Sequence, residues 1–240
     1  MNSSDLAVYH WPRVPARPAP GQPVLVRVAT TAARRAARVQ LREVVEEILA
    51  TWTGRPRAAP LLDETSRGPV CREPVDGQAV RLSFSYSHDA AWVALLLGGS
   101  VGVDAMRPEA FAEMPSVARL FLGPRAWSVI GSSAGPMRAF ARAWTEHEAT
   151  LKLAGQDLVE WRDDPADGVA HGNAAIERVD VEQFAGSRSP MPTHRERRTP
   201  QVPRLFFHES GQVIVTVAAG CEAPGFSHEL SLREAPERVV

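Results

Sequence analysis

Three strand-like segments follow one another closely in the middle of the chain, and this arrangement limits the possible folds more than any other feature. Residues Val80 to Tyr86 alternate apolar and polar side chains, which is typical of a strand with one buried face. Residues Trp92 to Leu97 are apolar throughout, and Gly98-Gly99-Ser100 turns the chain into a third short strand, Val101 to Asp104. Connections this short join antiparallel strands, because a parallel pair needs a much longer crossover. We therefore expect an α+β protein with antiparallel sheets rather than a parallel βαβ array.

Helical periodicity indicates three helices around these strands. Apolar residues recur at helical spacing from Thr31 to Thr51, and Ser116 to Ile130 and Pro136 to Ala154 are also expected to be helical. Gly155 stands where a glycine commonly ends a helix.

Strands are expected again near the C-terminus. Arg204 to His208 and Gln212 to Ala218 flank Glu209-Ser210-Gly211, which predicts a hairpin. The order of helix followed by antiparallel strands thus occurs twice. We expect two similar halves, residues 1–100 and 101–240, each a small antiparallel sheet packed on a helix.

Composition and charge exclude several classes of protein. The 240 residues are 44% hydrophobic and 23% charged, an ordinary balance for a globular protein. No apolar run is long enough for a transmembrane helix, and the N-terminus lacks the features of a secretory signal. Cys71 and Cys221 are isolated, so we expect a cytoplasmic protein with reduced thiols and no membrane partner. A net charge of −1 gives no general case for nucleic-acid binding.

Two short segments concentrate the residues capable of chemistry. Gly102-Val103-Asp104 places a carboxylate at the end of a strand, where it could hold a hard cation. On the helix from Pro136 to Ala154, Glu148 and Lys152 are one turn apart and face the same way. One of the two side chains could bind a metal ion that holds a phosphate, and the other could neutralise the charge of that phosphate. Taken alone, however, a glutamate and a lysine one turn apart are more often a solvated surface ion pair.

Several segments match a known pattern in the right order. Gly102 to Met106 fits Gly-(Ile/Val)-Asp-x-Glu except at its last position, and Trp144 to Lys152 fits Trp-x-x-Lys-Glu-(Ala/Ser)-x-x-Lys with His147 in place of the first lysine. Ser83 to His88 is similar to Phe-Asn-Leu-Ser-His, and Arg67-Gly68-Pro69 is more weakly similar to Gly-Lys-Pro. Together these segments resemble the signature of the phosphopantetheinyl transferases of the Sfp type.

The resemblance implies a fold and a reaction. The fold would be two pseudo-symmetric α+β halves with coenzyme A bound in the cleft between them. The serine of an apo acyl, peptidyl or aryl carrier protein would attack the β-phosphate of coenzyme A, and adenosine 3′,5′-bisphosphate would leave. A monomer is expected, because one chain holds both halves of the cleft.

The resemblance also implies roles for individual residues. Asp104 and Glu148 would bind Mg²⁺, and Glu148 would take the serine proton. Lys152 would neutralise charge on the leaving phosphate. Ser87 and His88 would bind the phosphates of coenzyme A, and Arg67 would bind its nucleotide end. Arg38 would bind the 3′-phosphate. Arg34, Arg35 and Arg42 are alternatives for that last role.

Two positions depart from the family pattern. Met106 stands where most members supply a further carboxylate, and a thioether is too soft to bind magnesium usefully. A weakened magnesium requirement is therefore expected. His147 stands where a lysine is usual, and it either faces phosphate or lies in the core. Together these departures motivate a second hypothesis, a non-catalytic relative that binds coenzyme A or a carrier protein. An unrelated α+β binding protein is a third.

Overall fold

The computed structural model describes residues 6–55, 61–65, 68–161, 203–210 and 212–221. It is a mixed α+β structure, as expected from the sequence. In chain order its elements are β1 (Ala7–His10), β2 (Val24–Ala29), α1 (Arg34–Thr53), β3 (Leu62–Thr65), β4 (Gly68–Cys71), β5 (Val80–Tyr86), β6 (Ala90–Leu97), β7 (Gly99–Met106), α2 (Met114–Val117), the π-helix η1 (Ala118–Leu122), α3 (Gly123–Ser132), α4 (Pro136–Ala154), β8 (Arg204–Ser210) and β9 (Val213–Cys221).

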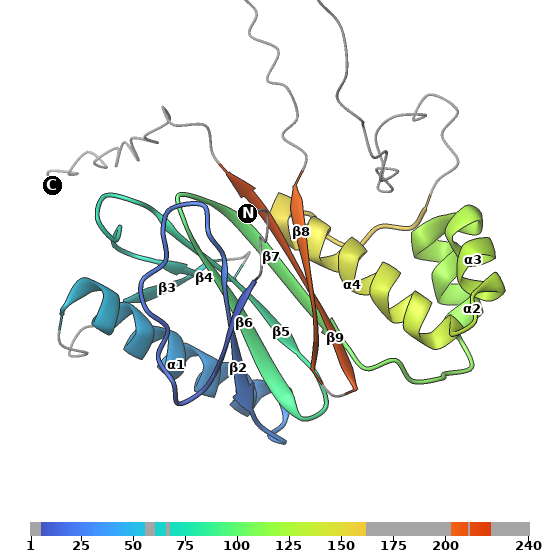
Figure 1. Ribbon diagram of the computed structural model, residues 1–240, viewed down its shortest axis with the longest axis horizontal. Coiled ribbons are helices and arrows are strands. Elements are labelled where there is room, and N and C mark those ends of the chain that lie inside the picture. The colour runs from blue at the N-terminus through green and yellow to red at the C-terminus, as the bar shows by residue number, and fades with distance from the viewer. Residues whose placement is uncertain (1–5, 56–60, 66–67, 162–202, 211, 222–240) are drawn as a thin grey trace, which may run out of the picture.

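Two sheets pack face to face between two helices (Figure 1). The first sheet has the order β1-β2-β6-β5 and the second β7-β9-β8, while β3 and β4 form a separate hairpin. Strand β6 lies inside the first sheet and is buried on both faces. Its residues Val93 and Leu95 belong to the core beneath α1, and its residues Trp92 and Leu96 belong to the core between the sheets. The other face of the second sheet is covered by α4.

The two sheets meet where the edge strands β5 and β7 come together. The backbone N–H of Val103 donates a hydrogen bond to Ser83 Oγ at 3.1 Å, and the N–H of Ala105 donates one to Ser85 Oγ at 3.0 Å. Serine hydroxyls on β5 therefore satisfy backbone donors on the outer edge of β7. This junction fixes the position of Asp104, which lies between the two bonded residues.

A group of short helices packs at the N-terminal half of α4, away from the sheets (Figure 1). Its core is aromatic: the Phe140 and Trp144 rings stack with centroids 5.7 Å apart, and Phe121 meets Trp144 edge to face at 5.9 Å. The segment from Ser116 to Ile130 is helical as expected, but it is divided among α2, η1 and α3 instead of forming one continuous α-helix. The chain breaks at Gly123, whose φ of +87° lies in the region that favours glycine.

Several other expectations are confirmed or corrected. Strand β5, helix α4 with its left-handed Gly155 cap and the β8–β9 hairpin occur where the sequence predicts them. The turn predicted at Gly98-Gly99-Ser100 is shorter, because β7 already begins at Gly99. Strands β1 to β4 are not predicted. None of the helices in the described ranges combines the length and the apolar character needed to cross a membrane.

Candidate active site

Helix α4 lies directly on strand β7 because the residues between them are small. Ala141, Thr145 and Ala149 follow one another at four-residue spacing and are fully buried. At Gly102 a Cβ atom would stand 1.9 Å from the carbonyl oxygen of Ala149. The glycine of the Gly-Val-Asp segment is therefore required by the close approach of the helix backbone. This approach brings the last turns of α4 over Asp104.

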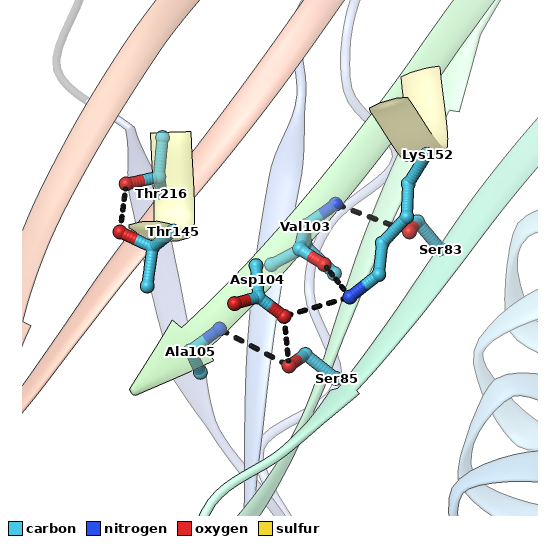
Figure 2. Close-up of polar contacts among 8 residues, drawn as sticks. All are labelled: Ser83, Ser85, Val103, Asp104, Ala105, Thr145, Lys152 and Thr216. Carbon is cyan, nitrogen blue, oxygen red and sulfur yellow. Dashed lines mark hydrogen bonds and ion pairs between the residues drawn. The ribbon is translucent and has the colours of Figure 1, made fainter. Parts of the chain in front are cut away.

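A second contact fixes the same helix to β9. The hydroxyls of Thr145 and Thr216 are both buried and lie 2.8 Å apart, so they form a hydrogen bond with each other (Figure 2). Thr216 pairs with Asp104 in the register of β7 and β9, and cross-strand pairs project to the same side of a sheet. The threonine pair therefore sits beside the Asp104 carboxylate and sets the rotation of α4 next to it.

Lys152 forms an ion pair with Asp104. Its Nζ lies 2.7 Å from Asp104 Oδ1 and 3.1 Å from the carbonyl oxygen of Val103, to which it also donates a hydrogen bond (Figure 2). The Asp104 side chain is 12% exposed and that of Lys152 is 32% exposed. The pair is therefore partly shielded from solvent. The interpretation of Lys152 as a surface residue paired with Glu148 is wrong, because its ion-pair partner in the structure is Asp104.

Ser85 orients the Asp104 carboxylate. Its hydroxyl donates to Asp104 Oδ1 at 3.0 Å while it accepts the N–H of Ala105, and Ser85 is buried. A hydroxyl that accepts from one fixed donor has its own proton directed elsewhere, here at the carboxylate. Both side-chain contacts of Asp104 are thus on the same oxygen.

Glu148 belongs to the same electrostatic cluster. Burial raises the pKa of Glu148, Lys152 partly lowers it, and the negative charge of Asp104 raises it further. Two carboxylates that influence each other in this way favour a cation between them. Glu148, Asp104 and Lys152 carry a net charge of one negative unit when all three are ionised.

The donor set fits a magnesium ion. Within the described part of the chain Asp104 Oδ2 makes no hydrogen bond, and Figure 2 shows it on the side away from Lys152. No three histidine, cysteine or acidic side chains converge on a metal site among the described residues. Two carboxylates are nevertheless a usual protein contribution to a magnesium site, because substrate phosphates and waters complete the octahedron. Asp104 and Glu148 are the residues that would hold the ion.

Ser87 and His88 lie in the turn between β5 and β6. The Ser87 hydroxyl donates to the carbonyl of Ala90 at 3.1 Å and accepts the indole N–H of Trp92 at 3.2 Å. Its hydroxyl is therefore already engaged in holding the turn. His88 is exposed at the tip of the same turn.

Two arginines of α1 gather near the end of β5. The guanidinium of Arg34 lies over the Tyr86 ring, 5.3 Å from its centroid. Burial raises the pKa of Tyr86, while the positive charges of Arg38 and then Arg34 lower it. Arg38 lies one turn after Arg34 on α1, and its charge acts on Tyr86, the last residue of β5. Arg67 lies outside the described residues.

The two departures from the family pattern occupy apolar surroundings. Met106 packs against the core of the helical group around α3. The His147 ring lies 6.5 Å from the ring of Trp144, and its Nε2 is buried without a hydrogen-bond partner in the described ranges. Burial lowers the pKa of His147 and favours its neutral form.

Two contacts of the site are not predicted from the sequence, the bond of Ser85 to Asp104 and the bond of Lys152 to Asp104. The alternation of serines on one face of β5 indicates that this face meets polar groups, but it does not identify Asp104 as the partner. Lys152 itself is predicted as a site residue, and it is the only lysine among 27 lysine and arginine residues.

Comparison of the chain with protein-family models finds no matching family, and comparison with curated proteins finds no match.

Proposed function

We propose that the chain is a magnesium-dependent phosphopantetheinyl transferase, which moves the phosphopantetheine arm of coenzyme A to a serine of an apo carrier protein. One observation carries the proposal. Three separate motif segments, on β5, β7 and α4, converge on a single cluster in which Ser85 and Lys152 both bond Asp104 Oδ1, with Glu148 electrostatically coupled.

The residues of this cluster have the properties that the transfer requires. The oxygen of the carrier serine forms a bond to the β-phosphorus of coenzyme A, and the bond from that phosphorus to the bridging oxygen breaks. Adenosine 3′,5′-bisphosphate carries away the bridging oxygen. Glu148 accepts the serine proton, since its raised pKa makes it a stronger base than an exposed carboxylate. Lys152 neutralises charge on the leaving phosphate.

Magnesium, when bound by Asp104 and Glu148, would supply charge neutralisation for the diphosphate. Ser85 keeps the Asp104 carboxylate in one orientation. Arg38 acts on Tyr86, and His88 follows Ser87. These two residues are the candidates for binding the phosphates of coenzyme A. In this proposal the two α+β halves, residues 1–100 and 101–240, are pseudo-symmetric, with coenzyme A in the cleft between them, and the protein works as a cytoplasmic monomer.

The test is the intact mass of apo carrier proteins of the fatty-acid, polyketide and peptide types after incubation with the protein, coenzyme A and Mg²⁺. We expect a gain of one phosphopantetheine group. Glu148→Gln should slow the reaction at least ~100-fold, the usual contribution of a positioned general base. Glu146→Gln is the matched control, because Glu146 lies on the same helix and burial also raises its pKa.

A second function is motivated by Met106 and His147, both in apolar surroundings where the family has charged residues. It is a non-catalytic relative that binds coenzyme A or a carrier protein. No mass gain on any carrier, with measurable binding of coenzyme A, would favour this function. Equal activity of the Glu148 and Glu146 variants would contradict the proposed role of Glu148.

A further inference from the structure

Lys152 pairs with the same carboxylate that is the candidate metal ligand. Its ammonium group bonds Asp104 Oδ1 at 2.7 Å and the carbonyl oxygen of Val103 at 3.1 Å. In the proposed reaction the same ammonium acts on a phosphate. Asp104 and the phosphate therefore compete for one positive charge.

The charges of the cluster make this exchange depend on a cation. Lys152 neutralises the charge of Asp104 in their ion pair. A divalent cation on the same carboxylate would repel the ammonium group, because like charges a few ångströms apart in a partly buried site interact strongly. Binding of the cation to Asp104 is therefore favoured when Lys152 leaves, and departure of Lys152 is favoured when a second anion receives it.

The side chain of Lys152 is suited to such a movement. It is 32% exposed, and its four-carbon stem is flexible. An arginine would hold the carboxylate with a planar fork of two parallel hydrogen bonds, whereas an ammonium is a compact point charge that can change partners. The one lysine of a chain otherwise supplied with arginines lies at this position.

We propose that Lys152 is an exchangeable internal cation: it neutralises Asp104 in the free protein and moves to a phosphate oxygen when a divalent cation binds Asp104. The cation and a diphosphate ligand consequently bind cooperatively, each weakly alone and tightly together. This inference rests on the proposed metal site, but it does not depend on whether a carrier protein is modified.

The first experiment follows the lysine itself. Protein grown with [¹³Cε]lysine gives a single lysine signal in a ¹H–¹³C correlation spectrum, because the chain has one lysine. The signal is recorded during addition of Mg²⁺ alone, of inorganic pyrophosphate alone, and of both together. In the last titration the concentration of free Mg²⁺ is calculated. We expect a new signal position with both, at a free Mg²⁺ concentration at least ~10-fold lower than Mg²⁺ alone requires, within the usual range of coupling between sites.

The second experiment removes the internal cation. Mn²⁺ binding is measured by electron paramagnetic resonance, without any phosphate, for the wild type, Lys152→Met and Lys152→Arg. Lys152→Met should bind Mn²⁺ ~10-fold or more tightly, since nothing competes for Asp104, while Lys152→Arg keeps the positive charge and binds as weakly as the wild type. Asp104→Asn in the Lys152→Met protein should abolish the gain, and thermal unfolding verifies that each variant is folded.

Two results would overturn the inference: a lysine signal that responds to pyrophosphate in the same way with and without Mg²⁺, or a Lys152→Met protein that binds Mn²⁺ no more tightly than the wild type. Failure of the proposed function is a separate result. If no carrier gains mass but the lysine signal shows coupling, the transferase proposal falls and the exchange of Lys152 stands.

Discussion

At the scale of single residues, the two carboxylates of the site differ in their surroundings. Asp104 receives hydrogen bonds from Ser85 and Lys152 on the same oxygen. Glu148 is half-buried, and its pKa is raised chiefly by that burial. Asp104 is therefore held in one orientation, and the raised pKa of Glu148 suits the proposed site, in which both carboxylates would hold a cation and Glu148 would also take a proton.

Met106 offers a test of the site at the residue scale. It lies two residues beyond Asp104 on β7, so both side chains project to the same face of the sheet. Met106→Glu should add a third carboxylate and lower the Mg²⁺ concentration needed for half-maximal transfer by about tenfold. The measurement is the rate of carrier modification against Mg²⁺ concentration.

Met106→Gln is the control for that substitution, because glutamine has the shape of glutamate without its charge. Both variants place a polar group against an apolar core and should lower the unfolding temperature similarly. If the two variants show the same dependence on Mg²⁺, the idea that position 106 faces the metal site is wrong.

His208 predicts a pH dependence of stability that does not involve the Asp104 cluster. Its ring meets Trp92 edge to face with centroids 6.2 Å apart, and Nε2 is buried without a hydrogen-bond partner among the described residues. Burial lowers the pKa of His208, His10 lowers it further, and Glu209 partly offsets the shift. The unfolded chain therefore binds a proton more readily than the folded protein, so stability is full above the ordinary histidine pKa and declines as pH falls below about 6.5.

The measurement is the free energy of unfolding by urea between pH 7.5 and pH 5. His208→Phe should reduce the decline on acidification. Phe207→Leu changes the neighbouring residue on the opposite face of β8 and should keep the full decline. An unchanged decline in His208→Phe would mean that other groups cause it.

At the scale of secondary-structure elements, the position of α4 on β7 controls the site. The helix carries Glu148 and Lys152, while the strand carries Asp104, and the two elements touch through the backbone at Gly102. A small increase in their separation would lengthen the 2.7 Å ion pair. The geometry of the candidate site thus depends on a residue that has no side chain.

Gly102→Ala should therefore be strongly destabilising and should impair the site. The new methyl group would meet the carbonyl oxygen of Ala149 at 1.9 Å and the backbone nitrogen of Leu153 at 2.6 Å, so α4 must shift. Overpacking of this kind costs about 1–3 kcal/mol of unfolding free energy. Urea unfolding and the Lys152 signal report the two effects.

Gly131→Ala is the matched control on α3. The nearest atom to its added methyl group is on Trp127 at 3.8 Å, an ordinary contact distance. Because alanine favours helices over glycine, this change should stabilise the protein by up to about 1 kcal/mol. A Gly102→Ala protein as stable as the wild type would show that α4 does not lie on β7 as described.

At the scale of the whole molecule, the second sheet joins distant parts of the chain. Strand β7 pairs with β9 from Gly99↔Cys221 to Met106↔Ile214, and among the described strands β8 pairs with β9 alone. The core between the sheets takes Phe206, Val213, Val215 and Val217 from the last two strands. The half of the core that faces the first sheet is consequently incomplete until the C-terminal hairpin is in place.

A chain that ends at Val202 should lose cooperative unfolding. It would lack β9, the strand that pairs with β7, as well as β8 and the buried apolar side chains of both strands. Each buried side chain of this kind contributes about 1.5–3 kcal/mol, so their combined loss is comparable to the whole stability of a domain. Near-ultraviolet circular dichroism during heating measures the cooperativity of unfolding. A sharp transition at a temperature near that of the full chain would contradict the expectation.

The sequence predicts the parts of this architecture that depend on local pattern. The alternation of Val80 to Tyr86 and the helical period of α4 need no distant partner to be recognised. Strands β1 and β2 are short and flank a proline-rich segment, and β2 is defined by pairing with β6 across more than sixty residues. Long-range pairing is set by tertiary contacts, which a local pattern does not contain.

The same distinction applies to the site. Asp104, Glu148 and Lys152 stand in recognisable motifs, and the structure brings Asp104 and Lys152 into contact. Ser85 could not be assigned a role from sequence, because its role depends on the meeting of β5 with β7 at the edges of two different sheets. The partner of Lys152 was also not predicted, since helical spacing points to Glu148 and only the fold provides Asp104.

The single lysine has a practical consequence. A protease that cuts only after lysine has one bond to cleave in the whole chain, between Lys152 and Leu153, and this bond lies inside α4. A helical segment must unwind and separate from β7 before a protease can bind it in extended form. The rate of this one cleavage therefore measures how often α4 opens, and a ligand that closes the site will be recognised by the survival of the intact chain.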